Sequence, residues 1–292
     1  MNPPEEPSKE DCCNSGCNPC IFEVYEKQLL LYKKRKEGEN ASELFFPNAI
    51  SQLHYTQFTV VDIAEICEAH KLLTFKLKSS DKNIRVTWKP GDHFLLKFTN
   101  ANCSCTRAYT PLKQKNNTGT DFSIIIKRYK NGLVSNYLYN LKSGQDVLWR
   151  GPYGAYEVIP NKFSRIFMIA QGTGIVPFMS IIESILENED DMTKLILCYC
   201  CRNVDSILLR TELYSMKCYW NFTYSVFLSD FKQNVVYKYQ EPIVNHKLNK
   251  EELLKFVPFS EKDQFLLCGS TQFMEHFKLW LKIQEVENVF TF

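Results

Sequence analysis

The sequence lacks any long hydrophobic run and any strong excess of charge of one sign. No segment reaches the roughly 18 uninterrupted apolar residues that a membrane-spanning helix needs, so we expect no transmembrane segment. The 35 basic and 33 acidic residues give a net charge of +2, which argues against nucleic acid as a partner, because that partner calls for a strongly basic face. The GxSxG, HExxH and phosphate-loop motifs are also absent, so hydrolase and kinase functions have no support.

The first ten residues, MNPPEEPSKE, lack the features of a targeting segment. They carry neither the basic and apolar regions of a secretory signal nor the arginine-rich composition of a transit peptide, and Asn2 excludes N-myristoylation. We therefore expect a soluble, cytoplasmic protein whose membrane association, where it occurs, is made through a partner. In a reducing compartment, its 12 cysteines are expected to be thiols or metal ligands rather than disulfides.

The composition that is present is that of an ordinary globular protein, long enough for two domains. The 292 residues are 45% hydrophobic and 23% charged. In residues 41–160, short apolar or alternating runs are separated by turn-formers such as KPGD and KNG, which indicates an antiparallel barrel or sandwich. In residues 161–292, strands and helices alternate, which indicates a parallel sheet with crossover helices. Residues 1–40 form a separate cysteine-rich segment with a short helix, whose apolar face is expected at Phe22, Tyr25, Leu29 and Tyr32.

A glycine turn opens the α/β region. In IAQGTGIVPF, a strand runs into Gly172-Thr173-Gly174 and then into a helix, with Pro177 near its first turn. Glycine permits close backbone approach, and a phosphate can lie against the N–H groups at the positive end of a helix. The sequence is GxGxxP rather than the dinucleotide fingerprint GxGxxG. From this motif alone, a nucleotide site and a turn without a ligand are equally supported.

Two motifs in the β region carry groups suited to a phosphate and to a planar ring. CTRAYTP places Arg107, Tyr109 and Thr110 near the end of a strand. An arginine fork can hold a phosphate, and a tyrosine can lie against a planar ring. In IIIKRYKNGLVSNYL, Gly132 and Ser135 lead into a helix, which is a second arrangement suited to a pyrophosphate.

The order of these motifs resembles that of the ferredoxin reductase-like flavoproteins and, among them, the NADH-cytochrome b5 reductases. It runs RxYT, KxYxxGxxS, RGPYG, GTGxxP and a late Cys-Gly pair, across residues 50–292. The segment PPEEPSKEDCCNSGCNPCIFEVYE resembles the oxidoreductase-like segment found in one branch of this family. The resemblance implies a β + α/β fold: an antiparallel FAD-binding β-barrel at 41–160, then a Rossmann-like, parallel-sheet nicotinamide-binding domain at 161–292.

The resemblance also implies roles for individual residues. Arg107 would bind the FAD pyrophosphate, Tyr109 would stack on the flavin, and Thr110 would hydrogen-bond near flavin N5. Thr110 and Cys268 are the expected catalytic residues. Further contacts with FAD are expected at Ile126, Lys127, Tyr129, Gly132, Val134 and Ser135. Contacts with NADH are expected at Lys127, Gly172, Thr173, Gly174, Cys268, Gly269 and Phe292.

The implied function is that of an FAD-dependent oxidoreductase. It would take hydride from NADH and pass electrons singly to a haem protein such as cytochrome b5. Hydride moves from nicotinamide C4 to flavin N5, so positioning of the two rings carries much of the rate, and no acid–base dyad is required. A quinone or a ferric chelate as the acceptor stays open.

Four departures from the family pattern bear on these implied roles, and two of them, at Gln171 and at 270–272, motivate an alternative function. RAYT replaces RPYT, and QGTGIVP replaces GGTGITP through Gln171 and Val176. STQ at 270–272 replaces a proline-rich wall of the nicotinamide pocket. Ser229 stands where the family has a ribose-binding aspartate, with Asp230 one place later, so we expect NADH, with NADPH as the alternative. The alternative function is a catalytically weakened, reductase-derived scaffold with a metal-binding or redox-sensing N-terminal cysteine cluster.

Four cysteines cluster in DCCNSGCNPC, at Cys12, Cys13, Cys17 and Cys20. Cys17 and Cys20 form a CxxC, which is half of a tetrahedral zinc site, but a second CxxC and a nearby histidine are missing. An iron–sulfur centre also needs four thiolates. Zinc or another metal, and a redox-sensitive or plain thiol cluster, are therefore equally supported by the spacing.

Overall fold

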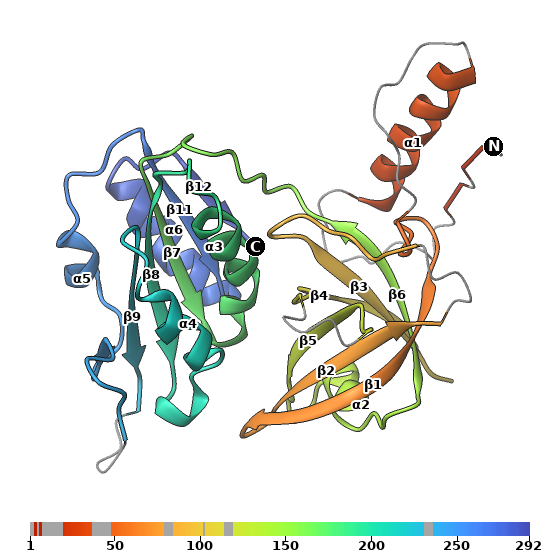
Figure 1. The fold of residues 1–292 in the computed structure, drawn as a ribbon, viewed down its shortest axis with the longest axis horizontal. Helices are drawn as coiled ribbons and strands as arrows, with labels where there is room; N and C mark the ends of the chain where they lie inside the picture. The colour runs from red at the N-terminus through yellow and green to blue at the C-terminus, as the bar shows by residue number, and fades with distance from the viewer. Residues whose placement is uncertain are drawn as a thin grey trace. The chain divides into compact units, whose positions relative to one another are not determined.

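The computed structural model describes residues 3–4, 6–7, 20–36, 48–78, 84–101, 103–113, 119–230 and 236–292. Contacts divide the chain into two units (Figure 1). The first comprises Met1–Glu65 and Ala69–Ala155, and the second comprises Ile66–Glu68 and Tyr156–Phe292. The three-part domain division at residues 40 and 160 stays a prediction. Among the helices that the structure describes, none is both long and apolar enough to cross a bilayer.

The first unit is built on a six-stranded antiparallel sheet with the order β4-β3-β6-β1-β2-β5. Its strands are β1 (Thr56–Cys67), β2 (His70–Leu77), β3 (His93–Thr99), β4 (Ser104–Tyr109), β5 (Phe122–Lys127) and β6 (Asp146–Tyr153). The edge strands β4 and β5 are connected through Leu112 and Ser123, whose backbone groups exchange hydrogen bonds of 2.8 and 3.0 Å. This bridge closes the sheet into the predicted barrel.

The barrel core is aromatic at its centre. The Phe122 ring lies 5.0–5.1 Å from the rings of Phe58, Phe75 and Phe94, and 5.6 Å from that of Trp149. Helix α2 (Leu133–Tyr139) adds its buried Val134 and Leu138 to the same cluster. Residues of all six strands contribute to this cluster or pack against it.

Helix α1 (Ile21–Lys36) packs on the outside of the barrel. Among its described side chains, Ile21 and Val24 are buried, and they contact a patch that consists of Leu53, Leu95 and Tyr153. The four positions of the expected apolar face are only half-buried. Two of the four, Phe22 and Tyr25, pack against the same patch, so part of the expected face lies against the barrel.

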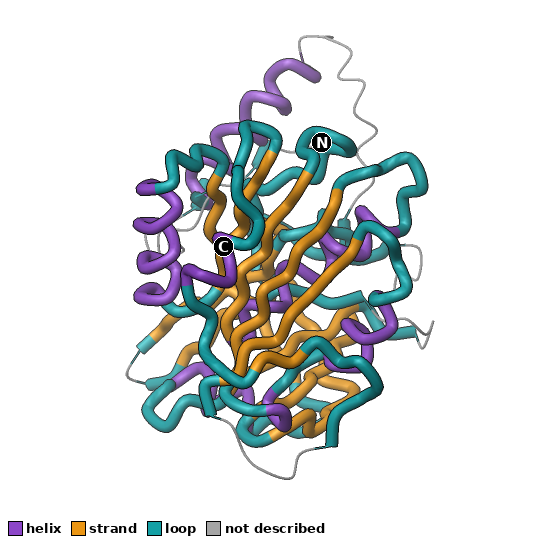
Figure 2. Tube along the Cα trace, turned by 90° about the vertical axis from the view of Figure 1, so that its left-hand side faces the viewer, coloured by secondary structure: helices purple, strands orange, loops and turns teal. Residues whose placement is uncertain are grey.

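The second unit is a six-stranded sheet with the order β10-β9-β8-β7-β11-β12, and all of its strand pairs are parallel. Figure 2 draws the strands of the molecule in orange. Its strands are β7 (Arg165–Gln171), β8 (Lys194–Cys201), β9 (Phe222–Leu228), β10 (Ile243–Val244), β11 (Asp263–Cys268) and β12 (Val289–Thr291). Its helices are α3 (Val176–Leu186), α4 (Arg210–Met216), α5 (Lys250–Leu254) and α6 (Thr271–Ile283), with short 3-10 turns at Gly172–Ile175 and Val204–Ser206. The predicted parallel sheet with crossover helices is therefore confirmed.

Helices cover both faces of this sheet. Phe167 and Phe265 stack 4.6 Å apart on the face that is covered by α6, where Trp280 and Leu281 are buried. Figure 1 shows α3 and α4 on the opposite face. Because both faces are buried, β7 and β11 are almost continuously apolar, as expected for parallel strands between two helical layers.

The amino ends of β7 and β11 are connected by a buried ion pair. Arg165 Nε and Nη2 donate to the two carboxylate oxygens of Asp263 at 2.7 and 2.6 Å. Burial alone would raise the pKa of Asp263, but hydrogen bonds from Arg165 and from the Ser260 N–H outweigh it and lower that pKa. The ion pair fixes the end of the sheet that lies opposite the glycine turn.

Candidate active site

In the first unit, the end of β4 presents the predicted Arg-x-Tyr-Thr motif. Arg107 is exposed, and its Nη1 donates to the Thr106 carbonyl at 2.8 Å. Tyr109 is half-buried, with its ring edge-on to Trp149 at 5.9 Å. Burial raises the pKa of Tyr109, so its hydroxyl stays neutral and able to donate. Thr110 follows directly and is also half-buried.

The end of β5 brings further predicted residues to the same place. Lys127 and Tyr129 are exposed, and Lys127 Nζ lies 5.5 Å from the centre of the Tyr129 ring. The antiparallel bridge between Leu112 and Ser123 brings the segment after β4 alongside β5. Charges on Arg107 and Tyr129 both act on the pKa of Tyr109. The Ile126 side chain lies in the barrel core, which leaves only its backbone for contact with a ligand.

The predicted turn before α2 is held by its own serine. The Ser135 hydroxyl donates to the Gly132 carbonyl at 3.1 Å and accepts from the Tyr129 N–H at 3.2 Å. A Cβ atom on Gly132 would lie 2.4 Å from Ser135 Oγ, so a side chain there would displace the hydroxyl that holds the turn. Val134 faces the core. An exposed guanidinium, two tyrosine rings and a tight glycine turn therefore gather in this unit, and these groups fit a flavin with its pyrophosphate.

In the second unit, the Gly172-Thr173-Gly174 turn follows β7 as predicted. Gly172 has a φ of +55°, a conformation that favours glycine. A Cβ atom on Gly174 would lie 2.3 Å from the carbonyl oxygen of Cys268, at the end of β11. The second glycine is therefore required by contact with the protein's own backbone, where the sequence suggested contact with a ligand.

A buried tyrosine that the sequence did not reveal holds this turn. Tyr199, on β8, is fully buried. Its hydroxyl donates to the Gly172 carbonyl at 3.1 Å and accepts from the Leu208 N–H at 3.3 Å. In the apolar run KLILCYCC, this tyrosine is one more residue of a buried strand, so no sequence signal distinguished it.

Two residues that depart from the family pattern, Gln171 and Ser270, contact each other. Gln171 Oε1 accepts hydrogen bonds from the Ser270 N–H at 3.1 Å and from the Ser270 hydroxyl at 2.8 Å. Ser270 also caps α6, because its Oγ accepts from the Phe273 N–H at 3.4 Å. We call this pair the Gln171–Ser270 bridge.

The remaining nicotinamide-side candidates lie around the ends of β11 and β12. Burial raises the pKa of the Cys268 thiol to about 12, so the thiol is protonated at neutral pH and is not a nucleophile. Gly269 has no room for a side chain, because a Cβ atom there would lie 2.8 Å from Gln171 Cβ. The Phe292 ring lies 5.6 Å from the rings of Tyr156 and Phe178.

The carboxyl end of β9 carries the residues expected to select the nucleotide. Asp230 Oδ2 lies 3.7 Å from Arg202 Nε, and both side chains are exposed. The N–H groups of Ser229 and Asp230 donate to the carbonyls of Cys201 and Arg202 at 3.0 and 2.7 Å. An acidic and a basic group therefore stand together where a ribose or its 2′-phosphate would be distinguished.

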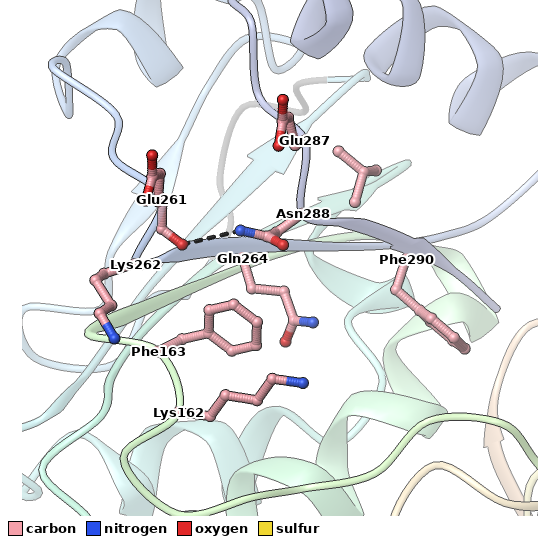
Figure 3. Close-up of a pocket in the computed structure, with 9 residues that line it drawn as sticks. Lys162, Phe163, Glu261, Lys262, Gln264, Glu287, Asn288 and Phe290 are labelled. Carbon is pink, nitrogen blue, oxygen red and sulfur yellow. Dashed lines mark hydrogen bonds between the residues drawn. The ribbon is translucent and has the colours of Figure 1, made fainter.

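A polar cavity of about 500 Å³ lies at the other end of this unit (Figure 3). Its lining comes from the segments that precede β7, β11 and β12 and from the first residues of β11 and β12, and it includes Lys162 and Glu287. The Asn288 side chain donates to the Glu261 carbonyl at 2.9 Å across it. None of its described lining residues is a predicted site residue, so the cavity is separate from the glycine turn.

Three of the clustered cysteines, Cys12, Cys13 and Cys17, lie outside the described residues. Cys20 is a half-buried free thiol just before α1, and its N–H donates to the Glu23 carboxylate at 2.9 Å. Within the described ranges, no group of three or more His, Cys, Asp or Glu side chains is arranged to hold a metal ion.

Comparison with protein families assigns each part of the chain. The oxidoreductase FAD-binding domain matches residues 57–158, and the oxidoreductase NAD-binding domain matches residues 168–278. The N-terminal segment of oxidoreductase-like proteins matches residues 1–41. The first two matches fall on the barrel and on the parallel sheet, and they contain the candidate binding groups described above except Phe292, which follows the second match.

Proteins with a similar sequence or fold point to the same family. The chain is 29% identical to human NADH-cytochrome b5 reductase-like, over 92% of this chain and 87% of the relative. It is 31% identical to NADH-cytochrome b5 reductase 1 of Scheffersomyces stipitis, over 74% of both chains. The cytochrome b5 reductase domain of Ulva prolifera nitrate reductase has the same fold, with a TM-score of 0.67 at 22% identity, over 84% of this chain and all of that one. The chain belongs to the NADH-cytochrome b5 reductase family and is an FAD- and NAD-binding oxidoreductase of that family.

Proposed function

We propose that the protein takes hydride from NADH onto FAD and passes electrons singly to a haem protein such as cytochrome b5. The observation that carries this proposal is the presence, on one chain, of two sets of groups. One is the Arg107–Tyr109–Tyr129 group within the FAD-binding match, and the other is the Gly172 turn within the NAD-binding match. Relatives whose names state NADH and cytochrome b5 support the choice of donor and acceptor.

On the flavin side, the chain's own residues bind and orient. FAD supplies the redox chemistry, since it can accept two electrons together and release them one at a time. Arg107 would hold the pyrophosphate through its exposed guanidinium, supported by backbone groups of the Gly132 turn. The neutral Tyr109 ring would lie against the flavin, with Thr110 donating near N5. Lys127 and Tyr129 would enclose the remaining edge.

On the nicotinamide side, backbone groups carry the binding. The Gly172-Thr173-Gly174 turn would face the pyrophosphate at the start of α3. Cys268, Gly269 and Phe292 would form the wall beside the nicotinamide ring. Because the Cys268 thiol stays protonated, its role would be to pack against the ring and exclude water, with no covalent step.

The proposal is tested by anaerobic stopped-flow reduction of the purified protein with NADH and NADPH in parallel, followed by mixing with ferric cytochrome b5. We expect a yellow protein that bleaches faster with NADH and then reduces the haem at the same rate as it regains its colour. A colourless protein that takes up no FAD would contradict the proposal and would favour the reductase-derived scaffold. Bleaching without haem reduction would leave the flavin chemistry intact and reject the acceptor.

A metal at the N-terminal cysteines remains a separate proposal. It is supported by the CxxC of Cys17 and Cys20 and by the match of residues 1–41 to the oxidoreductase-like segment. Metal content would be measured on the full chain and on its Cys17→Ser variant. Equal metal content in the two proteins would reject the site.

A further inference from the structure

The Gln171–Ser270 bridge crosses the point of the sheet where an open α/β fold binds its ligands. Along the chain, β7 is followed by its neighbour β8 on one side, whereas its neighbour on the other side is β11. The order of strands therefore reverses between β7 and β11, and ligands bind outside the carboxyl ends of the strands at such a reversal. Gln171 ends β7, and Ser270 stands just past β11, 99 residues later.

The bridge lies directly over backbone that a ligand would approach. Gly269 would place a Cβ atom 2.8 Å from Gln171 Cβ, so the glutamine side chain runs against the Gly269 backbone. Beneath it, Gly174 and Cys268 are in backbone contact. Gln171 and Ser270 are both exposed, so their hydrogen bonds can exchange with those of another molecule without opening the core.

The hydrogen-bonding groups of the bridge match the nicotinamide end of the proposed dinucleotide. Ser270 offers two donors, its N–H and its hydroxyl, at the positive end of the 13-residue helix α6. Gln171 occupies both donors with the oxygen of a carboxamide. Nicotinamide carries the same carboxamide group, whereas the ADP-ribose part of the dinucleotide has none.

We propose that Gln171 sets the affinity for the nicotinamide nucleotide by occupying, with its own carboxamide, the Ser270 donors that the nicotinamide carboxamide takes when it binds. This inference rests on the proposed function, because it assigns a specificity residue to the same nucleotide site. Nucleotide binding then requires the bridge to open, and removal of the glutamine side chain removes that cost. A typical neutral hydrogen bond contributes a net of about 1 kcal/mol, which corresponds to a gain of roughly threefold to tenfold in affinity.

The test is calorimetric titration of the full-length protein with NAD⁺ and, separately, with ADP-ribose. The variants are Gln171→Ala, Gln171→Ser, Ser270→Ala and the double variant Gln171→Ala/Ser270→Ala, with Gln284→Ala at the far end of α6 as the matched control. We expect Gln171→Ala and Gln171→Ser to bind NAD⁺ about threefold to tenfold more tightly and to bind ADP-ribose unchanged. Because the bridge also stabilises the nucleotide-free protein, we expect their thermal midpoints to fall by no more than about 4 °C. The gain should shrink in the Ser270→Ala background, where one of the two donors is already missing.

Unchanged or weaker binding of NAD⁺ by both Gln171 variants would overturn the inference while leaving the proposed function standing. An equal gain for ADP-ribose would also overturn it, because that ligand has no carboxamide. If neither the wild type nor any variant binds either ligand, the proposed function and the inference fail together.

Discussion

The two units present their candidate binding groups in opposite ways. In the barrel, the groups are side chains on strand ends, such as Arg107 and Tyr129, which are exposed and make few contacts with the rest of the protein. In the parallel sheet, the groups of the glycine turn are backbone atoms, and Gly174 is in such close contact with Cys268 that no side chain fits. A side chain of the first site can therefore be removed without unfolding the barrel. In the second site, the backbone contacts that form the turn also hold the parallel sheet together.

The strongest way to test this difference is to add one carbon at Gly174. In Gly174→Ala, the new Cβ would lie 2.3 Å from the Cys268 carbonyl oxygen, and backbone at the ends of two strands would have to move. We expect the free energy of unfolding to fall by more than about 3 kcal/mol, measured by chemical denaturation. Gly172→Ala is the matched control, because its Cβ would meet nothing within 4 Å and only the strain of the positive φ remains, about 1–2 kcal/mol. Equal losses in the two variants would contradict the account of close contact.

The Arg165–Asp263 pair tests whether the amino ends of β7 and β11 can be destabilised without a loss of nucleotide affinity at their carboxyl ends. In Asp263→Asn, Arg165 loses its buried carboxylate partner, and we expect a loss of about 3 kcal/mol in unfolding free energy at pH 7, with unchanged affinity for NAD⁺ at 20 °C.

The pH dependence of that loss has a definite sign. The pKa of Asp263 is lower in the folded protein than in the unfolded chain. Its contribution is therefore fully present above the unfolded value, near 4, and is lost as the pH falls through the folded value. Denaturation curves of wild type and Asp263→Asn should converge below about pH 4, while the exposed Asp190→Asn should match the wild type throughout. Parallel curves over the whole pH range would contradict this assignment.

In contrast to the substitutions in the parallel sheet, removal of a side chain in the barrel should weaken cofactor binding without lowering stability. We expect Arg107→Ala to weaken FAD binding by about tenfold to a hundredfold, because a charged hydrogen-bonding partner of the pyrophosphate is lost, and to leave the thermal unfolding of the FAD-free protein unchanged. The measurements are the flavin-to-protein absorbance ratio and fluorescence titration of the apoprotein, with Lys142→Ala as a control on the same unit. If Arg107→Ala lowered the stability of the apoprotein, binding and folding would not be separate in the barrel.

The smallest effect is expected at the end of β9. Asp230→Ala frees the Arg202 guanidinium, and we expect the ratio of kcat/KM for NADPH to that for NADH to rise by roughly threefold to tenfold. Arg202→Ala should move the ratio in the other direction. Steady-state kinetics with both nucleotides checks the pair, and an unchanged ratio in both variants would place nucleotide selection elsewhere.

Much of the fold follows from local sequence patterns, because strand alternation and the strand–glycine–helix order are encoded within short windows. The ends of β4, β5 and β7 carry the motifs that were expected there. What local patterns do not contain is contact between distant residues. The Gln171–Ser270 bridge spans 99 positions, and each residue alone is only a departure from a motif.

The two glycines of the turn show the same limit more sharply. Spacing identified both positions, but it could not tell a glycine that needs a positive φ from one that touches another strand. Gly172 is of the first kind and Gly174 of the second. Likewise, the Ser135 hydroxyl is bonded to Gly132 and Tyr129, a contact within the turn that the motif did not reveal, and the contact of Ser135 with a pyrophosphate stays a prediction.

The Tyr199 hydroxyl connects two loops that follow neighbouring strands, since it binds the Gly172 carbonyl and the Leu208 amide at once. The Leu208 proton is therefore bonded to the same oxygen atom that holds the glycine turn. Its exchange with deuterium in heavy water should slow when a nucleotide steadies the turn, and should quicken in Tyr199→Phe. A single amide, in a loop that is not itself proposed to touch the ligand, would then give a spectroscopic readout of the binding site.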